Sequence, residues 1–156
     1  MDIDTYATPD SLSVRRARRA DAAALHNLSA PFVVRGRLRC RKIDEFARRS
    51  DDFLVVEELG QIRACVGVQR FGAECVLDNL CVHTGSQGRR IGSLLVKCAV
   101  QEARRMSARA LYAASSPSNA WFIAHGFDSV EQVEGPRLWV DQLDPARNSV
   151  VYRRWI

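Results

Sequence analysis

The chain has 156 residues, of which 47% are hydrophobic and 26% charged, so it fits one compact domain and leaves little room for a second. No apolar run approaches the ~20 residues of a membrane span, and the acidic, polar start is unlike a secretory signal, so we expect a cytoplasmic protein with no membrane partner. The net charge of +5 comes from short arginine clusters rather than from a basic face with exposed aromatic residues, which favours an anionic small molecule or cofactor over nucleic acid.

The first fifty residues predict a tail, a strand and two helices. Residues 1–10 carry no hydrophobic pattern and are expected to be a flexible tail before a single domain over 11–156. A short strand is predicted over 12–17. Asp21 is placed to be the N-cap of a helix over 22–28, and residues 30–50 are expected to form a loop followed by a short helix.

Three adjacent antiparallel strands are predicted between residues 53 and 82, separated by turns at Gly60 and Gly72. Along the second strand every other residue is apolar (Ile62, Ala64, Val66, Val68), which is the pattern of a half-buried strand.

The second half of the chain alternates between helices and strands. Apolar residues at helical spacing predict an amphipathic helix over 91–106. A buried strand follows over 110–114, then a helix over 120–125 capped by Ser118 or Asn119, and then strands from residue 127 and over 150–155. The whole pattern indicates an α+β domain built on one mixed sheet.

The segment over residues 80–95 carries the most specific chemistry. A strand ends at Val82, a glycine-rich loop follows, and a helix begins at residue 91. The first turn of a helix has N–H groups without intrahelical partners, and its dipole favours an anion. Gly88 and Gly92 allow the backbone to approach a diphosphate closely, and Arg89 and Arg90 add mobile positive charge. The same glycines could simply form a turn and allow close helix packing.

The run Gln87-Gly-Arg-Arg-Ile-Gly resembles the Q/R-x-x-G-x-G/A signature of the GNAT N-acetyltransferase superfamily, with Arg90 in place of the first glycine. The resemblance implies a three-layer fold with a mixed, mainly antiparallel central sheet flanked by helices. It implies acetyl-CoA as cosubstrate, with the pyrophosphate on the loop and the pantetheine arm along the end of the strand. The expected cofactor-binding residues are Leu80, Cys81, Val82, Gln87, Gly88, Arg89, Arg90, Ile91, Gly92, Ser93 and Phe122.

A second run, Asn119-Ala-Trp-Phe-Ile-Ala-His-Gly-Phe, resembles the helix that closes over the thiol end of CoA in the same superfamily. Phe122 replaces the usual tyrosine, which protonates the leaving thiolate, and a phenyl ring cannot donate a proton. Protonation would then come from water or from a nearby hydroxyl group, with Ser115 and Ser118 as the candidates.

Several further segments together resemble the acetyltransferase domain of bacterial N-acetylglutamate synthase, over roughly residues 12–154. The resemblance implies that Arg41 binds the α-carboxylate of an amino acid and that Arg147 and Ser149 bind its side-chain carboxylate. Two arginines suit this task, because a guanidinium group binds a carboxylate through two parallel hydrogen bonds. The expected substrate-binding residues are Arg41, Asn79, Ser118, Arg147 and Ser149.

The general base differs from that of the family, because the family's catalytic glutamate aligns with Val76, which is no base. Asp78, on the same strand face by period-2 counting, or Glu74 nearby, is expected to serve directly or through water; Asp78 as a mere edge residue is the alternative. The hypothesis is direct acetyl transfer to the α-amine of glutamate or a similar acidic amino acid, in amino-acid metabolism and arginine biosynthesis. The alternatives are another small amine, an antibiotic or a protein N-terminus as acceptor, or an acyl-CoA-binding module without turnover; a homodimer is left open.

The five cysteines form no C-x-x-C pair and the three histidines are scattered, so we expect free thiols and no metal site. No cysteine has a histidine and a carboxylate at an interpretable spacing, which favours direct transfer over an acetyl-cysteine intermediate.

Overall fold

The computed structural model describes residues 6–7, 12–116 and 120–156, and the chain divides into two compact units. The first unit holds residues up to 67 together with 79–95, and the second holds 68–78 and 96–156. No helix in the described part of the chain is long and apolar enough to cross a membrane.

The sheet of the first unit follows the strand order β1-β2-β3-β4-β5, in which β1 to β4 pair antiparallel. Its strands are β1 (Tyr6–Ala7), β2 (Leu12–Arg16), β3 (Phe53–Glu58), the first part of β4 (Gln61–Phe71) and the end of β5 (Glu74–Val82). Part of the expected tail, residues 6 and 7, therefore pairs with β2.

A two-residue turn joins β3 to β4, and Leu59 and Gly60 both have positive φ there (52° and 77°). Two positive φ angles define the hairpin turn that matches the twist of its strands. Glu58 pairs with Gln61 at the end of this hairpin.

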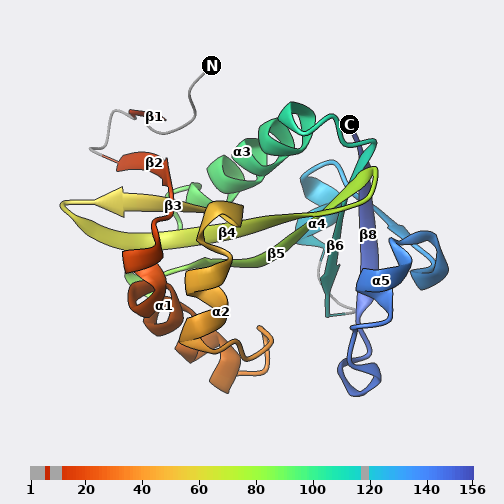
Figure 1. The fold of residues 1–156 in the computed structure, drawn as a ribbon, viewed down its shortest axis with the longest axis horizontal. Helices are drawn as coiled ribbons and strands as arrows, with labels where there is room; N and C mark the ends of the chain where they lie inside the picture. Colours follow the sequence, from red (N-terminus) through yellow and green to blue (C-terminus); the bar gives the residue numbers. More distant parts are fainter. Residues whose placement is uncertain (1–5, 8–11, 117–119) are drawn as a thin grey trace. The chain divides into compact units, whose positions relative to one another are not determined.

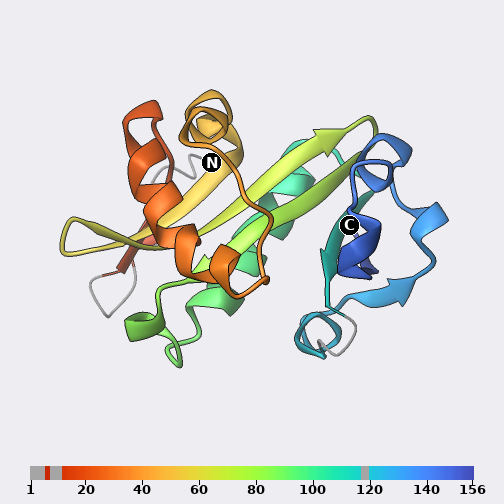
Figure 2. The same ribbon diagram turned by 90° about the horizontal axis from the view of Figure 1, so that it is seen from below.

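Helices α1 (Ala22–Val34) and α2 (Ile43–Arg48) cover one face of these strands, and the first turn of α3 (Ile91–Arg105) lies on the other face (Figures 1 and 2). The core under α1 and α2 joins helix and strand side chains: Leu25, Leu28, Phe32, Phe46, Phe53, Val55, Cys65 and Cys81.

The predicted end of α1 was wrong, and its predicted N-cap position was confirmed. The helix does not end near residue 28 but continues through Pro31 to Val34, because Leu25, Leu28 and Phe32 extend one buried stripe. Asp21 occupies the N-cap position but makes no side-chain cap. Its carboxylate instead accepts hydrogen bonds from the Arg15 guanidinium, at 2.8 and 3.1 Å, and these lower the pKa of Asp21.

The prediction that β4 is half-buried was also wrong, since residues 64–68 are buried on both faces. Cys65 packs in the core under α1 and α2, while Ala64 and Val66 point to the opposite face by alternation. Helices cover both faces of the sheet here, so residues 64–68 do not have the solvent-facing side that the alternation predicted.

The second unit follows the strand order β5-β6-β8-β7, with β5 and β6 parallel and the other pairs antiparallel. Its further strands are β6 (Ala110–Ser115), β7 (Asp128–Val130) and β8 (Val150–Trp155). Its short helices are α4 (Trp121–Ala124), η4 (Gln132–Glu134), α5 (Arg137–Val140) and η5 (Pro145–Arg147). The predicted order missed η4, α5 and η5, because single helical turns are too short to show a period.

The observed elements confirm the predicted α+β fold class, with a mixed, mainly antiparallel sheet flanked by helices. The core of the second unit gathers Val76, Ala110, Tyr112, Trp139 and Val151. The Tyr112 hydroxyl group donates to Glu74 and to the Glu134 carbonyl, at 3.0 Å each, and burial raises the pKa of this tyrosine.

Candidate functional site

The loop between β5 and α3 has the backbone shape that an anion site at a helix N-terminus needs. The chain leaves β5 at Val82, makes the single turn η3 (Thr84–Ser86) and enters α3 at Ile91. Gly88 has a φ of 84° and Arg90 a φ of 60°. The Leu94 N–H group donates to the Arg90 carbonyl at 3.1 Å, which closes the first turn of α3 directly after this loop.

Arg90 occupies the position of the first signature glycine, and its positive φ gives the physical reason why glycine is suited to this place. A residue with a Cβ atom pays roughly 1–2 kcal/mol in the left-handed region. The chain therefore keeps the glycine-like backbone conformation while carrying an exposed guanidinium there.

Side chains tie this loop to the end of the sheet. The Gln87 amide donates to the Val82 carbonyl at 3.1 Å, and the Gly85 N–H group donates to His83 Nδ1 at 3.0 Å. Arg63 on β4 donates from Nε to the buried Ser86 hydroxyl group at 2.8 Å. The Gln87 side chain therefore connects the loop to the end of β5. The contacts of Arg63, His83 and Ser86 were not predicted from the sequence.

Arg89 was expected to be a mobile charge, and that expectation was wrong. Its two terminal nitrogens bind both carboxylate oxygens of Glu58, at 3.0 and 2.9 Å. This paired geometry is the strongest form of an arginine–carboxylate contact, and it lowers the pKa of the Glu58 carboxyl group. The two residues are 31 positions apart, so no local spacing could have revealed the pair.

The end of β5 is irregular at Asn79, where φ is 50°. The residues after it are half-buried at Leu80 and Val82 and buried at Cys81. Asn79 itself is only 4% exposed. A left-handed residue inside a strand breaks its regular alternation, so counting faces along β5 does not carry past this position.

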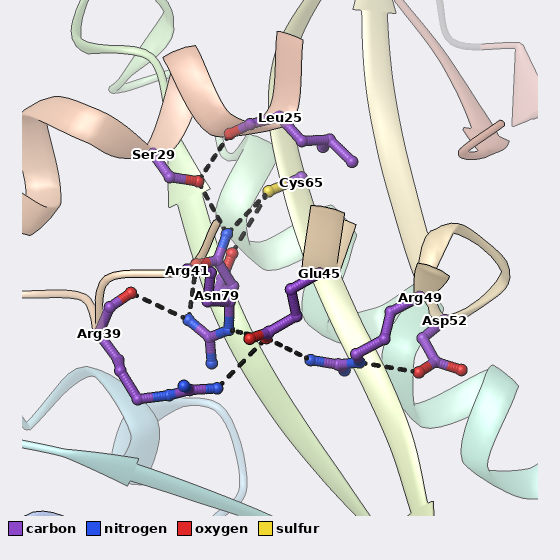
Figure 3. A network of polar contacts seen from close by, with 9 residues as sticks. All are labelled: Leu25, Ser29, Arg39, Arg41, Glu45, Arg49, Asp52, Cys65 and Asn79. Atoms are coloured by element: carbon purple, nitrogen blue, oxygen red, sulfur yellow. Dashed lines mark hydrogen bonds and ion pairs between the residues drawn. The ribbon is translucent and has the colours of Figure 1, made fainter. Parts of the chain in front are cut away.

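Arg41 and Asn79, two expected substrate contacts, meet in the first unit (Figure 3). Arg41 Nη1 donates to Asn79 Oδ1 at 2.9 Å, and Arg41 Nε lies 3.1 Å from Glu45 Oε2. The guanidinium belongs to a side chain that is 7% exposed, so Arg41 is not a solvated surface charge.

In the second unit, the two candidate bases on β5 differ in their surroundings. Glu74 accepts from Tyr112 and lies 3.3 Å from Arg109 Nη2, so its carboxylate is committed to a structural network. Asp78 is half-buried near the end of the segment that pairs with β6. The assignment of Asp78 as the base stays a prediction.

Phe122 is 6% exposed and sits among aromatic rings. Its ring stacks on Tyr152 with centroids 5.4 Å apart and meets Phe127 edge-on at 5.3 Å. Ser115 is half-buried at the end of β6, opposite Val150. Ser118 lies outside the described residues.

Arg147 and Ser149 lie in one segment of the second unit, between η5 and β8. Asp144 caps η5 by accepting from the Ala146 N–H group at 3.0 Å, and Asn148 has a φ of 50°. Arg147 is exposed and Ser149 half-buried, and the Ser149 carbonyl accepts from Gln132 at 2.9 Å.

Among the residues that the structure describes, no three His, Cys, Asp or Glu side chains gather as metal ligands would. The five cysteines carry free thiols, although Cys65 and Cys81 lie with sulfur atoms 3.8 Å apart.

The comparisons with known proteins agree with this geometry. The family model for an acetyltransferase (GNAT) domain matches residues 49–129, more than half of the chain. The chain is 28% identical over 122 residues to an amino-acid acetyltransferase of Shewanella oneidensis, with 77% of this chain and 27% of the relative covered. It is 29% identical over 136 residues to an amino-acid acetyltransferase of Aeromonas salmonicida, with 81% of this chain and 31% of the relative covered. The chain thus spans about a third or less of these relatives' length.

Two solved structures have a similar fold. N-acetylglutamate synthase from Neisseria gonorrhoeae, complexed with coenzyme A and N-acetyl-glutamate, matches with a TM-score of 0.87 and 24% identity over 92% of this chain and 35% of that one. A Mycobacterium tuberculosis protein in complex with CoA matches with a TM-score of 0.80 and 19% identity, covering 92% of this chain and 98% of that one.

Proposed function

The chain belongs to the acetyltransferase (GNAT) family, and from this premise we propose that it transfers an acetyl group from acetyl-CoA to the α-amine of a small amino acid, glutamate or a similar acidic one. The observation that carries the proposal is the β5–loop–α3 segment, in which left-handed backbone at Gly88 and Arg90 leads into a helix N-terminus. We further propose that residues 11–156 act as one catalytic domain.

The described residues fit acetyl-CoA as a cosubstrate. The loop over 87–90 and the first turn of α3 would hold the pyrophosphate, since backbone N–H groups and the helix dipole both favour an anion there. The end of β5, over Leu80, Cys81 and Val82, would pair with the pantetheine arm. Phe122 would offer an apolar wall toward the thiol end.

The reaction itself is proposed as direct attack on the thioester. Asp78, directly or through a water molecule, takes a proton from the acceptor's ammonium group, which titrates at or above pH ~8. The neutral amine then adds to the thioester carbonyl, and a backbone N–H group of Cys81 or Val82 stabilises the oxyanion. Collapse breaks the C–S bond while the nitrogen loses its second proton to water. The thiolate takes a proton from water, either directly or through the hydroxyl group of Ser115 or Ser118, which water then reprotonates.

Direct transfer is supported by the state of the cysteines. An acetyl-cysteine route needs an accessible thiolate. Four of the five cysteines (Cys65, Cys75, Cys81 and Cys98) are buried, and burial raises the pKa of the Cys98 thiol. Cys40 is exposed, but the sequence gives it no histidine and carboxylate at an interpretable spacing. Parallel reciprocal plots together with an isolable acetyl-enzyme would overturn this part of the proposal.

The proposal of an acidic amino acid as acceptor depends on two arginines, Arg41 and Arg147. Arg41 would bind the α-carboxylate, and Arg147 with Ser149 would bind a side-chain carboxylate, since guanidinium groups read carboxylates as paired forks. Asn79 and Ser118 complete the proposed acceptor set. The named activity of the curated relatives supports an amino acid as acceptor. A role in arginine biosynthesis, a cytoplasmic location and a homodimeric state are further parts of this proposal.

A panel of amino acids, small amines and peptide N-termini, assayed by thiol release from acetyl-CoA, tests the acceptor. The proposal expects acidic amino acids to give the highest kcat/KM. A higher kcat/KM for a peptide N-terminus or an antibiotic amine would mean that the acceptor is not an acidic amino acid. Tight acetyl-CoA binding by calorimetry without thiol release for any amine would identify an acyl-CoA-binding module instead.

A further inference from the structure

The side-chain amide of Asn79 is fully engaged with protein groups on its donor side. Its Nδ2 donates to Ser29 Oγ at 2.9 Å and to Cys65 Sγ at 3.5 Å. Ser29 in turn donates to the Leu25 carbonyl of α1 at 2.8 Å (Figure 3). An asparagine amide has two N–H donors, and both are used here. Asn79 therefore has no donor left for the carboxylate of a ligand.

The acceptor side of the same amide holds Arg41. Asn79 Oδ1 accepts from Arg41 Nη1 at 2.9 Å, and the Arg39 carbonyl accepts from the same nitrogen at 3.3 Å. From the other direction, Glu45 Oε2 lies 3.1 Å from Arg41 Nε. The guanidinium plane is thus fixed from β5 on one side and from α2 on the other, as Figure 3 shows.

Glu45 and Asn79 differ in their electrostatic effect on Arg41. Glu45 divides one carboxylate oxygen among three arginines, with Arg39 at 3.3 Å and Arg49 at 3.6 Å in addition to Arg41. Asn79 is neutral, so its hydrogen bond fixes the guanidinium without cancelling its charge. A carboxylate at this buried position would form an ion pair and compete with any anionic ligand.

We propose that Asn79 is a positioning residue that aims Arg41 at an anionic group of the acceptor and, being neutral, preserves the charge that binds it. The inference rests on the proposed function for the identity of the acceptor. It also changes the role of Asn79, from a direct substrate contact to a residue that acts through Arg41. The backbone supports this role, because the φ of 50° at Asn79 places the amide between α1 and the Arg41 side chain.

Two substitutions separate the parts of this role. Asn79→Gly retains a residue suited to positive φ and removes the amide, so the guanidinium loses its fixed partner. Asn79→Asp retains the acceptor oxygen and adds a charge that pairs with Arg41. Asp44→Asn is the matched control, because Asp44 binds Arg48 on the exposed face of α2 at 2.9 Å and lies outside the network.

Steady-state kinetics with L-glutamate at saturating acetyl-CoA gives the first readout. Asn79→Gly should raise KM about tenfold or more, the factor expected for a lost charge-assisted contact, with kcat within about threefold of the parent. Asn79→Asp should raise KM further, and Asp44→Asn should change neither constant. Wild-type KM in both Asn79 variants would overturn the proposal, as would an equal loss of kcat with KM unchanged.

A second readout does not depend on turnover. The Nη1–H signal of Arg41, recorded at low temperature and assigned with Arg41→Lys, should be sharp and slow to exchange in the parent, because Nη1 donates to Asn79, and broadened or fast-exchanging in Asn79→Gly. If the parent fails to acetylate L-glutamate, the proposed acceptor is wrong, and this signal then decides the positioning role alone. An Arg41 signal unchanged by Asn79→Gly would refute the positioning role.

Discussion

At Arg90, in the loop between β5 and α3, substitutions can separate the effect of the backbone conformation from the effect of the side-chain charge. Its φ of 60° costs a residue with a Cβ atom roughly 1–2 kcal/mol. Glycine removes that cost but gives back ~0.5–1 kcal/mol through its larger freedom in the unfolded chain. Arg90→Gly should therefore raise the free energy of unfolding by about 0.5–1 kcal/mol, or Tm by about 1–4 °C for a chain of this size.

Arg90→Ala is the control, because it removes the guanidinium and keeps the Cβ atom. It should leave stability near that of the parent. If the guanidinium meets a phosphate of acetyl-CoA, both variants should weaken binding by the same factor, about fivefold for one exposed contact. Thermal unfolding and calorimetric titration with acetyl-CoA measure the two effects. Equal stability of the glycine and alanine variants would refute the backbone argument.

Three further substitutions test the surroundings of the site. Glu58→Gln should weaken acetyl-CoA binding a few-fold, since Arg89 loses its fixed partner. Because the folded-state pKa of Glu58 is lowered, its stabilising effect should be present at neutral pH and lost as pH falls through and below ~4, so Tm of parent and variant should converge there. Tyr112→Phe should lower the free energy of unfolding, measured with denaturant, by about 1–2 kcal/mol, because Glu74 loses a buried hydrogen-bond donor. Because the folded-state pKa of Tyr112 is raised, the hydroxyl group should stabilise the fold below pH ~10, and this contribution should be lost as the pH rises further. If the free energies of unfolding of the parent and Tyr112→Phe depend on pH in the same way, the result would count against the contact. Asp78→Asn should lower kcat about a hundredfold or more, measured by thiol release, and an undiminished kcat would remove Asp78 as the base.

Much of the fold follows from local patterns in the sequence. The period-2 and helical stretches predicted β2 to β6, α3 and β8 to within a few residues, because each has enough length to show its period. The sequence did not reveal where α1 ends: the helix continues past residue 28 and through Pro31, and Phe32 in this extension is buried. The single-turn helices of the second unit lack a period altogether.

The site divides in the same way. The glycine-rich loop was found because its residues are contiguous and their conformations are set locally. The Glu58–Arg89 pair and the Asn79–Arg41 contact join residues 31 and 38 positions apart, so they depend on the register of the sheet. Glu45 was the exception, since its i,i+4 spacing from Arg41 could have indicated an ion pair.

Acetyl transfer to an amino acid is the central claim, and product analysis tests it most directly. The chain is incubated with acetyl-CoA labelled with ¹³C at the carbonyl carbon and with L-glutamate. Carbon NMR then follows the label while thiol release is counted. The account predicts that the thioester signal is replaced by an amide signal on the α-nitrogen, with one CoA released for each amide formed. Persistence of the thioester with bound acetyl-CoA, for glutamate and for every other amine offered, would contradict it.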